Sequence, residues 1–412
     1  MSYEFFIAKR IIASKEYKSS VSAPIIKIAI TAIAMGIIMM LVSVATGVGL
    51  QDKIREKVTA FHGDIIMSNY DTNFSYDDQV PISLDQEFYP NNGFFPNITH
   101  IQPTASKGGV IRTETDFEGI IVKGVDGNYS WNYLEDYLIE GRLPKVGEES
   151  LNSEVLLSEY LANRLQIKVG DRIATFFLRE DTSKPPRSVG FTIVGLYNSG
   201  FQEFDEQFLF ADIRHIQRLN GWASNEVGTF ELFVDDFKNI DAIGNAVYLN
   251  SPSNVDVETI RGRFMNIFDW LDMFDFNIFL IIGIMIVVAG INMITALLVL
   301  ILERTHMIGL LKALGSNNWS VRKIFIYNAM YLIGVGLFWG NLIGIGFLFI
   351  QKYFKILPLD PSTYYVSEVP VYLHLNYILA LNIGTFVLCL AMLLIPTYII
   401  AKISPVRALR FE

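Results

Sequence analysis

The chain has 412 residues, of which 51 % are hydrophobic and 18 % charged, with one cysteine and a net charge of −9. Soluble domains carry about 25 % charged residues, so this composition excludes an ordinary soluble protein as well as a disordered one. The single cysteine excludes a secreted scaffold held by disulfides, and the acidic balance argues against a nucleic-acid-binding protein.

Four stretches of 24 to 33 residues contain no Asp, Glu, Lys or Arg: 28–51, 276–302, 324–351 and 369–401. A helix needs about 20 apolar residues to cross the hydrocarbon core of a bilayer. The sequence therefore predicts four transmembrane helices, at 28–51, 276–302, 324–351 and 373–401. The first is expected to be an uncleaved anchor, because its apolar run is longer than the roughly 7–15 residues of a signal peptide.

The distribution of basic residues predicts the orientation of these helices. The N-terminal amphipathic segment 1–27, the loop 303–323 and the tail 402–412 together hold twelve Lys and Arg, whereas the short loop 352–372 holds two. Short loops rich in Lys and Arg stay in the cytoplasm. We therefore expect a multi-pass protein of the cell inner membrane, with both termini cytoplasmic and with 52–275 and 352–372 in the periplasm.

Residues 52–275, which we call the inserted domain, contain 19 Lys and Arg against 36 Asp and Glu, a net charge of −17. Such a charge keeps a domain soluble but identifies no ligand. Short β-rich runs alternate with helical ones, which predicts an α+β domain. The strands are expected near 109–113, 118–125, 172–178, 190–197 and 207–210, and the helices near 158–165, with Ser158 as N-cap, and 212–220.

Both ends of the inserted domain continue the helical spacing of the adjacent spans. Apolar residues lie on one helical face over 52–61, and again over 260–274. We therefore expect two helical stalks that carry the domain. Asp269, Asp272 and Asp275 share one face of the second stalk, and we interpret them as a solvated face rather than a metal site.

Signatures of catalysis are missing from the sequence. It has no nucleotide-binding loop of the G-x-x-x-x-G-K-[ST] type, no H-E-x-x-H, no G-x-S-x-G and no Cys/His cluster. Of the five scattered histidines, we expect four at the surface, and Cys389 is expected to be buried in the fourth span. The spans hold no charged residue, which argues against an ion-coupled transporter.

The loop 303–323 carries a short amphipathic helix. Met307, Leu310, Leu311 and Leu314 fall at i, i+3, i+4 and i+7, which predicts one apolar stripe. Gly315 is placed to end this helix. Such a helix either lies on the lipid surface or docks into a groove of a partner protein.

Several motifs, in register with this topology, resemble the FtsX/MacB-like permeases, which are membrane subunits of ABC transporters. The run E-R-T-H-M-I-G-L-L-K-A-L-G at 303–315 is similar to their coupling helix, and the tail 403–412 is similar to their closing P-x-x-A-L-R-x-E. The stretch L-A-N-R-L-Q-I-K-V-G-D at 161–171 also fits. The runs F-F-I-A-K-R-I-I at 5–12 and V-G-L-Y-N-S-G-F-Q-E-F-D-E within 191–210 resemble the lipoprotein-releasing LolC/LolE branch.

The resemblance implies a permease subunit that is not an enzyme, needs no cofactor and works by mechanotransmission. A separate cytosolic ATPase of the LolD type would grip the loop helix and, on binding ATP, close the spans and shift the inserted domain. The implied partners are this ATPase, a second permease subunit (identical or different), membrane lipid and a triacylated lipoprotein cargo. The implied ATPase-coupling residues are Glu303, Arg304, Met307, Gly309, Leu310, Leu311, Leu314 and Gly315.

Two other functions stay open. One is an FtsX-like regulatory subunit that controls a periplasmic cell-wall hydrolase, and the other is a MacB-like export subunit, although MacB carries its ATPase on the same chain. The hairpin loop 178–188 is shorter than the protruding loop of carrier-recruiting permeases. Whether this chain passes cargo to a periplasmic carrier protein is therefore open as well.

Two further sets of residues are predicted to act within the membrane. Gly336, Gly340 and Gly344 form two overlapping G-x-x-x-G steps, which predict close packing of another helix, within the subunit or across a dimer. The cargo needs an apolar cleft near the outer leaflet, and only the first two spans connect directly to the inserted domain. The predicted cleft residues are Met40, Val44, Val48, Phe274, Ile278 and Ile282.

Overall fold

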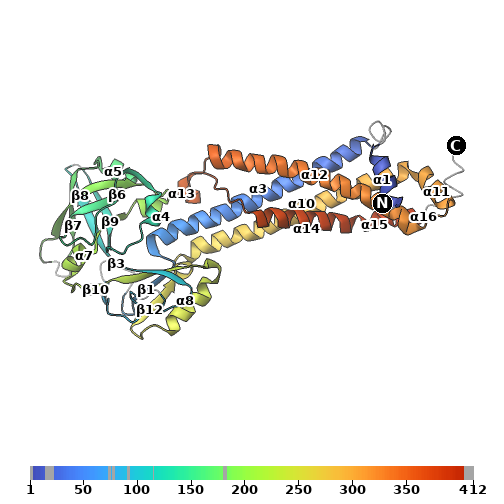
Figure 1. Ribbon diagram of the computed structural model, residues 1–412. Coiled ribbons are helices and arrows are strands. Elements are labelled where there is room, and N and C mark those ends of the chain that lie inside the picture. Colours follow the sequence, from blue (N-terminus) through green and yellow to red (C-terminus); the bar gives the residue numbers. More distant parts are fainter. Residues whose placement is uncertain are drawn as a thin grey trace. The chain divides into compact units, whose positions relative to one another are not determined.

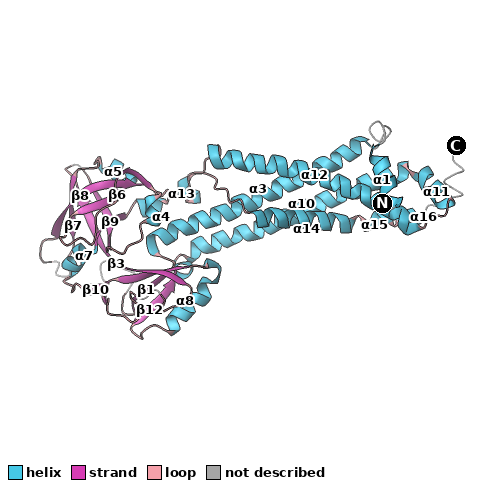
Figure 2. Ribbon diagram, viewed as in Figure 1, coloured by secondary structure: helices cyan, strands magenta, loops and turns pink. Residues whose placement is uncertain are grey.

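The computed structural model describes residues 3–13, 23–72, 76, 79–90, 93–114, 116–179 and 183–402 (Figure 1). The chain divides into two compact units. A helical unit comprises Met1–Gln51, Leu271–Pro358 and Glu368–Glu412, and a mixed unit comprises Asp52–Trp270 and Leu359–Ser367. The second unit matches the predicted inserted domain, except that it ends at Trp270 and includes residues 359–367; from here on the name inserted domain denotes this unit. All the strands drawn in Figure 2 belong to it.

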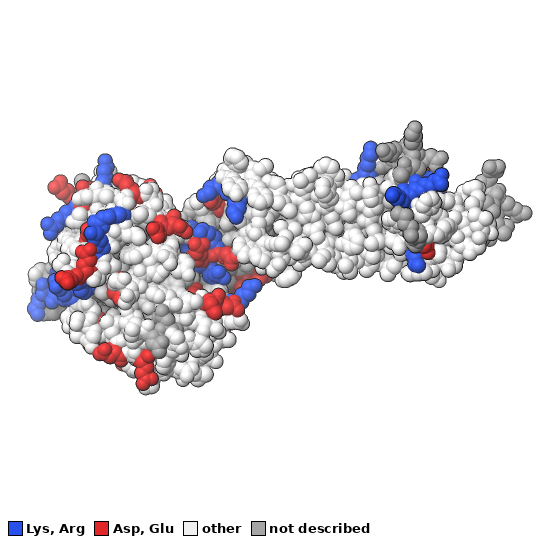
Figure 3. Space-filling view, viewed as in Figure 1, with Lys and Arg blue, Asp and Glu red and all other residues white. Residues whose placement is uncertain are grey.

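Four helices among the described residues are long and apolar enough to cross a membrane. Lipid offers no partner for backbone N–H and C=O groups, so a helix, which satisfies them internally, is the form that such apolar runs adopt. On the face seen in Figure 3, a wide band of the helical unit shows only uncharged residues. The helices that form this unit are α1 (Tyr3–Ala13), α3 (Ala23–His62), α10 (Met265–Glu303), α11 (Thr305–Ala313), α12 (Asn318–Phe354), α14 (Leu375–Met392), α15 (Leu394–Thr397) and α16 (Ile399–Lys402).

The spanning helices share an apolar core with a polar link between two of them. Ile33 of α3, Met293 of α10 and Phe325 of α12 are almost fully buried in one cluster. Asn341 of α12 and Asn382 of α14 exchange two side-chain hydrogen bonds, at 2.6 and 2.9 Å. Hydrogen bonds between polar side chains stabilise helix association in lipid, so this amide pair fixes α14 against α12.

The inserted domain contains one large sheet that is partly closed on itself. The strands β3, β4, β9, β6, β8 and β7 pair in that order, and β7 pairs back to β3, so six strands form a ring. The long β3 also pairs with β11, which continues through β1 to β12 as an antiparallel sheet. Because β3 belongs to both parts, it joins them into one domain.

The strands of the domain are β1 (Ile65–Asn69), β2 (Ile82–Ser83), β3 (Ile98–Arg112), β4 (Phe117–Val125), β5 (Leu138–Gly141), β6 (Glu154–Ser158), β7 (Arg172–Phe177), β8 (Arg187–Tyr197), β9 (Phe208–Asp212), β10 (Glu226–Val227), β11 (Thr229–Val234) and β12 (Val255–Thr259). Its helices are α4 (Asn132–Glu135), α5 (Glu159–Leu165), α6 (Gln202–Asp205), α7 (Ile213–Asn220), η1 (Phe237–Asn239), α8 (Ile240–Leu249), α9 (Ile260–Arg263) and α13 (Pro361–Tyr364).

The end of α3 lies in the aromatic core of the inserted domain. Phe61 is fully buried, and its ring centroid lies 4.6 Å from that of Phe204 and 5.7 Å from those of Phe208 and Phe210. Aromatic pairs at such distances stabilise the fold by more than the burial of their surface area alone would. The last turn of the first spanning helix is thus held by the strand and turn residues of the domain.

The predicted fold class is confirmed: four apolar helices, with a large α+β domain inserted between the first and the second. Two local predictions, on Ser158 and Cys389, are also confirmed. Ser158 caps α5 by accepting a hydrogen bond from the Leu161 N–H at 3.1 Å, and Cys389 is buried within α14.

Two expectations are wrong. The second stalk is not one helix over 260–274, because Phe264 (φ −109°, ψ 42°) interrupts it between α9 and α10. There its ring packs on the ring of His62, with the centroids 5.0 Å apart. Four histidines were expected at the surface, but His62 and His215 are both buried, since aromatic neighbours cover their rings.

Candidate functional sites

The predicted coupling helix is α11, in the loop between the second and third spanning helices. Arg304 leaves the helical region (φ −100°, ψ 19°) and so separates α11 from α10. At the other end, Gly315 has φ +95°, and its N–H donates to the Lys312 carbonyl at 3.0 Å. This left-handed glycine ends the helix as the sequence predicts, and the Asn317 side chain caps the start of α12.

The structure divides the predicted apolar stripe of α11 between two faces. Ile308 and Leu311 are buried in the core of the helical unit, and Met307 packs against that core. Leu310 and Leu314 are instead 45 % and 76 % exposed. One continuous stripe is therefore the wrong description, because residues 310 and 311 point about 100° apart around the helix. Leu310 of α11 and its C-cap residue Leu314 are therefore two exposed leucines on the outer face of this helix.

Polar contacts hold α11 in place. The Lys312 ammonium donates to the Ile400 carbonyl at 2.6 Å, and burial together with the nearby charge of Arg322 lowers the pKa of Lys312. Gly309 is buried on the inner face of the helix, while Glu303 is exposed at the end of α10.

The N-terminal helix α1 packs beside this loop. The hydroxyls of Tyr3 and Ser316 lie 3.1 Å apart, and the Glu4 carboxylate lies 3.8 Å from the Lys323 ammonium. Ala8 is buried in the same core as the inner face of α11. These contacts attach α1 to the turn that follows α11 and to the first turns of α12.

The three glycines predicted to pack closely do lie together, against α3. A Cβ at Gly336 would meet Ile33 at 2.8 Å, one at Gly340 would meet the Ala34 carbonyl at 2.9 Å, and one at Gly344 would meet Leu41 at 3.2 Å. The glycine face of α12 therefore allows the backbones of the first and third spanning helices to approach each other within one subunit.

The predicted cleft residues are more enclosed than a lateral opening requires. Met40, Val44 and Ile278 are buried, and Ile278 packs where Gly47 leaves space in α3. Val48, Phe274 and Ile282 are partly exposed. The structure thus brings the two spans into contact through these positions.

A polar pocket of about 80 Å³ lies at the end of α3 within the inserted domain. Its lining includes Lys123, Glu231, His62 and Arg263. Burial, and then the charges of Lys123 and Arg263, hold the pKa of His62 well below its usual value, so its imidazole is neutral. This cluster was not among the predicted sites, although the sequence holds one signal for it, a lysine in the otherwise apolar strand I-I-V-K-G-V.

The segment 198–205, part of a stretch that resembles the LolC/LolE branch, forms a compact turn. The Asp205 carboxylate accepts hydrogen bonds from the Ser199 hydroxyl at 2.7 Å and from the Gly200 N–H at 3.0 Å. Burial raises the pKa of Asp205 to about 6. This turn fixes Phe201, which is fully buried, at the point where residues 359–367 pack against the rest of the domain.

Two family models together cover most of the chain. The model of the MacB-like periplasmic core domain matches residues 28–266, and that of the FtsX-like permease C-terminal domain matches residues 279–405. The chain belongs to the FtsX/MacB-like family of ABC transporter permeases. It is therefore a permease subunit and not an enzyme, and the family resemblance read from its motifs is confirmed.

Relatives of this permease carry the names of the expected branch. It is 22 % identical over 399 residues to the lipoprotein-releasing system transmembrane protein LolC of Xylella fastidiosa, with 93 % of each chain covered. It is 22 % identical over 437 residues to LolE of Haemophilus influenzae, with 99 % of each covered. Among solved structures, the extracellular domain of the ABC-type transporter YknZ matches 47 % of the permease and 99 % of that chain, with 13 % identity and a TM-score of 0.33.

Two further points concern the tail motif and metal binding. The tail motif at 403–412 lies outside the described residues. In the part of the chain that the structure describes, no group of three His, Cys, Asp or Glu is placed to hold a metal ion.

Proposed function

We propose that this permease releases lipoproteins from the outer leaflet of the inner membrane, driven by a separate cytosolic ATPase through mechanotransmission. The names of relatives that match over nine-tenths of the chain support this cargo. Twelve Lys and Arg in 1–27, 303–323 and 402–412 support cytoplasmic termini and a periplasmic inserted domain.

The observation that carries the proposal is the geometry of α11. The core holds its inner face, while Leu310 and Leu314 remain exposed on the outer face. Fully burying such a side chain is worth about 1.5–3 kcal/mol, so the pair would provide a compact apolar contact for a groove in the ATPase. A helix fixed by its own subunit would pass a movement of the ATPase to the spans, whereas a loosely attached helix would absorb it.

The first spanning helix is long enough to carry this movement out of the membrane. The 40 residues of α3 correspond to about 60 Å, roughly twice the thickness of the hydrocarbon core. Its end at Phe61 is buried in the inserted domain. When the ATPase dimer closes, we expect α3 to displace that domain as it moves.

In this scheme the acyl chains of the cargo enter between the first two spans near the outer leaflet. Val48, Phe274 and Ile282 are the partly exposed members of the predicted cleft, and separation of α3 from α10 would expose Met40, Val44 and Ile278. A second permease subunit would close the other side of the cleft.

The test is purification of the permease with its ATPase in mild detergent, followed by mass spectrometry of bound polypeptides. We expect a triacylated lipoprotein that is present without ATP and lost when ATP is added. A peptidoglycan hydrolase in place of the lipoprotein would contradict release and favour the FtsX-like regulatory function. A bound outer-membrane export component would favour the MacB-like function.

A further inference from the structure

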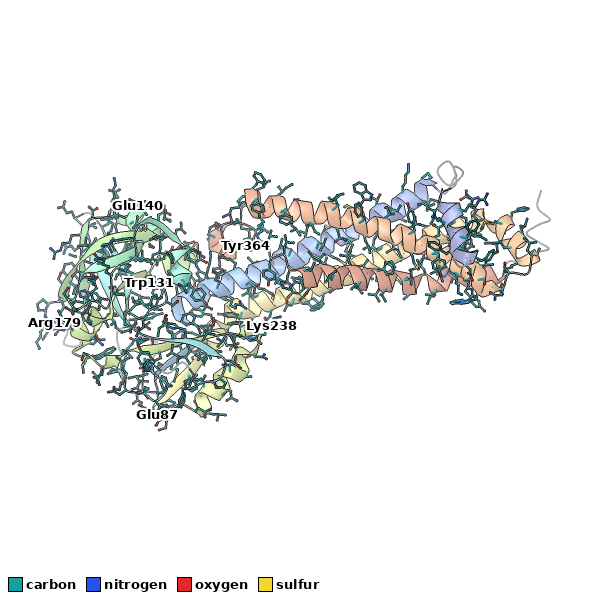
Figure 4. The ribbon with its side chains drawn as sticks, viewed as in Figure 1. Glu87, Trp131, Glu140, Arg179, Lys238 and Tyr364 are labelled. Carbon is teal, nitrogen blue, oxygen red and sulfur yellow. The ribbon has the colours of Figure 1, made fainter. Side chains whose placement is uncertain are left out.

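The segment between the third and fourth spanning helices belongs to the inserted domain. Residues 359–367 group with that domain, although the chain on either side of them continues into α12 and α14. The segment contains the short helix α13, which Asp360 caps by accepting a hydrogen bond from the Ser362 N–H at 3.1 Å. Tyr364, labelled in Figure 4, ends α13 and is followed by Tyr365.

Tyr365 is the residue that attaches this segment. Its ring stacks on that of Phe201, with centroids 4.6 Å apart and planes 21° apart, and the edge of the Trp270 ring lies near it. Its carbonyl accepts a hydrogen bond from the Lys57 ammonium at 3.0 Å. Lys57 belongs to α3 and is only 4 % exposed, so the bond is shielded from water.

Tyr365 ends α13 in a left-handed backbone conformation. Its φ is +58°, in the left-handed region that bulky side chains rarely adopt. A residue stays in such a conformation only where its surroundings over-determine it. The hydrogen bond from its own N–H to the Pro361 carbonyl at 3.0 Å, which ends α13, holds it there together with the stacked ring and the buried lysine.

The other side of the contact is equally constrained. Gly200 has φ +65°, and a Cβ there would lie 3.0 Å from the Lys57 nitrogen, so the glycine leaves the space that the lysine occupies. Phe201 stacks on Phe204 at 4.3 Å, and Phe204 in turn lies 4.6 Å from Phe61. A continuous row of rings thus runs from Tyr365 to the end of α3.

We propose that Tyr365 anchors a second mechanical link, through which the third and fourth spans act on the inserted domain in addition to the helix α3. A pull on residues 359–367 reaches Phe61 through Phe201 and Phe204, at the same point where α3 enters the domain. The two inputs meet there, so the domain responds to the whole bundle rather than to the first two spans alone. This inference rests on the mechanotransmission in the proposed function.

The first test measures attachment and needs no cargo. Hydrogen exchange of 359–367 is compared in the full-length permease–ATPase complex for the wild type, Tyr365→Ala and the matched control Tyr364→Ala. We expect amides of this segment to exchange at least tenfold faster in Tyr365→Ala and at the wild-type rate in Tyr364→Ala. Equal protection in all three proteins would overturn the anchor.

The second test measures transmission. In the wild-type complex, adding ATP is expected to change hydrogen exchange around Phe61 and Phe201. Tyr365→Ala should lose at least half of this change while its ATPase rate stays within twofold of wild type, and Tyr365→Phe, which keeps the ring, should behave as wild type. An undiminished ATP response in Tyr365→Ala would overturn the link.

The remaining outcomes separate this inference from the proposed function. One outcome is that the wild-type complex shows the ATP response, Tyr365→Ala loses it, and the wild-type complex binds no lipoprotein. This outcome would support the link and contradict lipoprotein release. A wild-type complex without any ATP response in the inserted domain would contradict both.

Discussion

Lys123 of β4 and Glu231 of β11 form an ion pair in the interior of the inserted domain, with side chains only 2 % and 5 % exposed. The Lys123 ammonium also donates to the carbonyl of Phe61, in the last turn of α3. Glu231 accepts a further hydrogen bond from the Gln102 amide at 2.9 Å. Buried charges of this kind are tolerated because the ammonium and the carboxylate are paired with each other and hydrogen-bonded to their neighbours. The pair ties the end of the first spanning helix to two strands of the sheet.

Removing one member of this pair should strongly destabilise the inserted domain. Lys123→Met leaves the Glu231 carboxylate buried without its cation, which typically costs about 3–5 kcal/mol. The measurement is the free energy of unfolding in urea. The control is Lys145→Met, because the Lys145–Glu148 pair is exposed and its atoms are 3.9 Å apart. Similar losses in the two variants would contradict the interpretation of Lys123 as a structural tie.

A negative charge on the exposed face of α11 should impair ATPase binding. Leu310→Glu and Leu314→Glu place a carboxylate where we expect an apolar groove, at a cost of a few kcal/mol if the face becomes buried. Co-purification of the ATPase should fall at least tenfold while membrane insertion is unchanged. Asn318→Glu adds the same charge in the same loop and should leave binding intact. Normal binding by both leucine variants would favour contact of α11 with lipid instead.

A side chain at Gly340 should force the first and third spanning helices apart. Its Cβ would lie 2.9 Å from the Ala34 carbonyl, and overpacking of this kind typically costs about 1–3 kcal/mol. Gly340→Leu should lower the melting temperature in detergent. Gly346→Leu is the matched control, since no neighbouring atom lies within 4 Å of a Cβ there. Equal melting temperatures for the two variants would show that α12 does not depend on this contact.

The turn that holds Phe201 should make the inserted domain sensitive to pH. Burial raises the pKa of Asp205 to about 6 from an ordinary value of 3.8, so folding favours the protonated carboxyl. The contribution of Asp205 to the free energy of unfolding is full below the pKa that this carboxyl has in the unfolded chain. It is lost as the pH rises through about 6, which lowers the free energy of unfolding by up to about 3 kcal/mol. Asp205→Asn cannot titrate, so its stability should change less between pH 4.5 and 7. Parallel stability curves for the two proteins would contradict this.

Features with local causes could be predicted from the sequence. The spans follow from uninterrupted apolar runs, and the ends of α5 and α11 follow from one capping serine and one left-handed glycine. The exposure of Leu310 and Leu314 could not be predicted, because periodicity groups them with Leu311. The two faces differ only in the folded bundle, where a core formed by several helices buries Leu311.

Features that join distant segments could not be predicted. Lys123 and Glu231 are brought together by strand order, and nothing local pairs them. Phe264 interrupts the helix at the place where its ring packs on His62 and Phe204, which belong to other elements. Helical periodicity in the sequence does not reveal such contacts. The same holds for Tyr365, whose assignment to the inserted domain depends on Phe201 and Lys57.

The central claim is ATP-driven release of a lipoprotein from between the first two spans, and photocrosslinking in proteoliposomes tests it most directly. A photoreactive amino acid is placed at Val48, Phe274 or Ile282, with Phe338, an exposed residue of α12, as the control position. We predict that the first three positions capture an acylated protein before ATP is added and lose it afterwards, while Phe338 captures little in either state. Capture at Phe338 alone, or capture that ATP leaves unchanged, would contradict the claim.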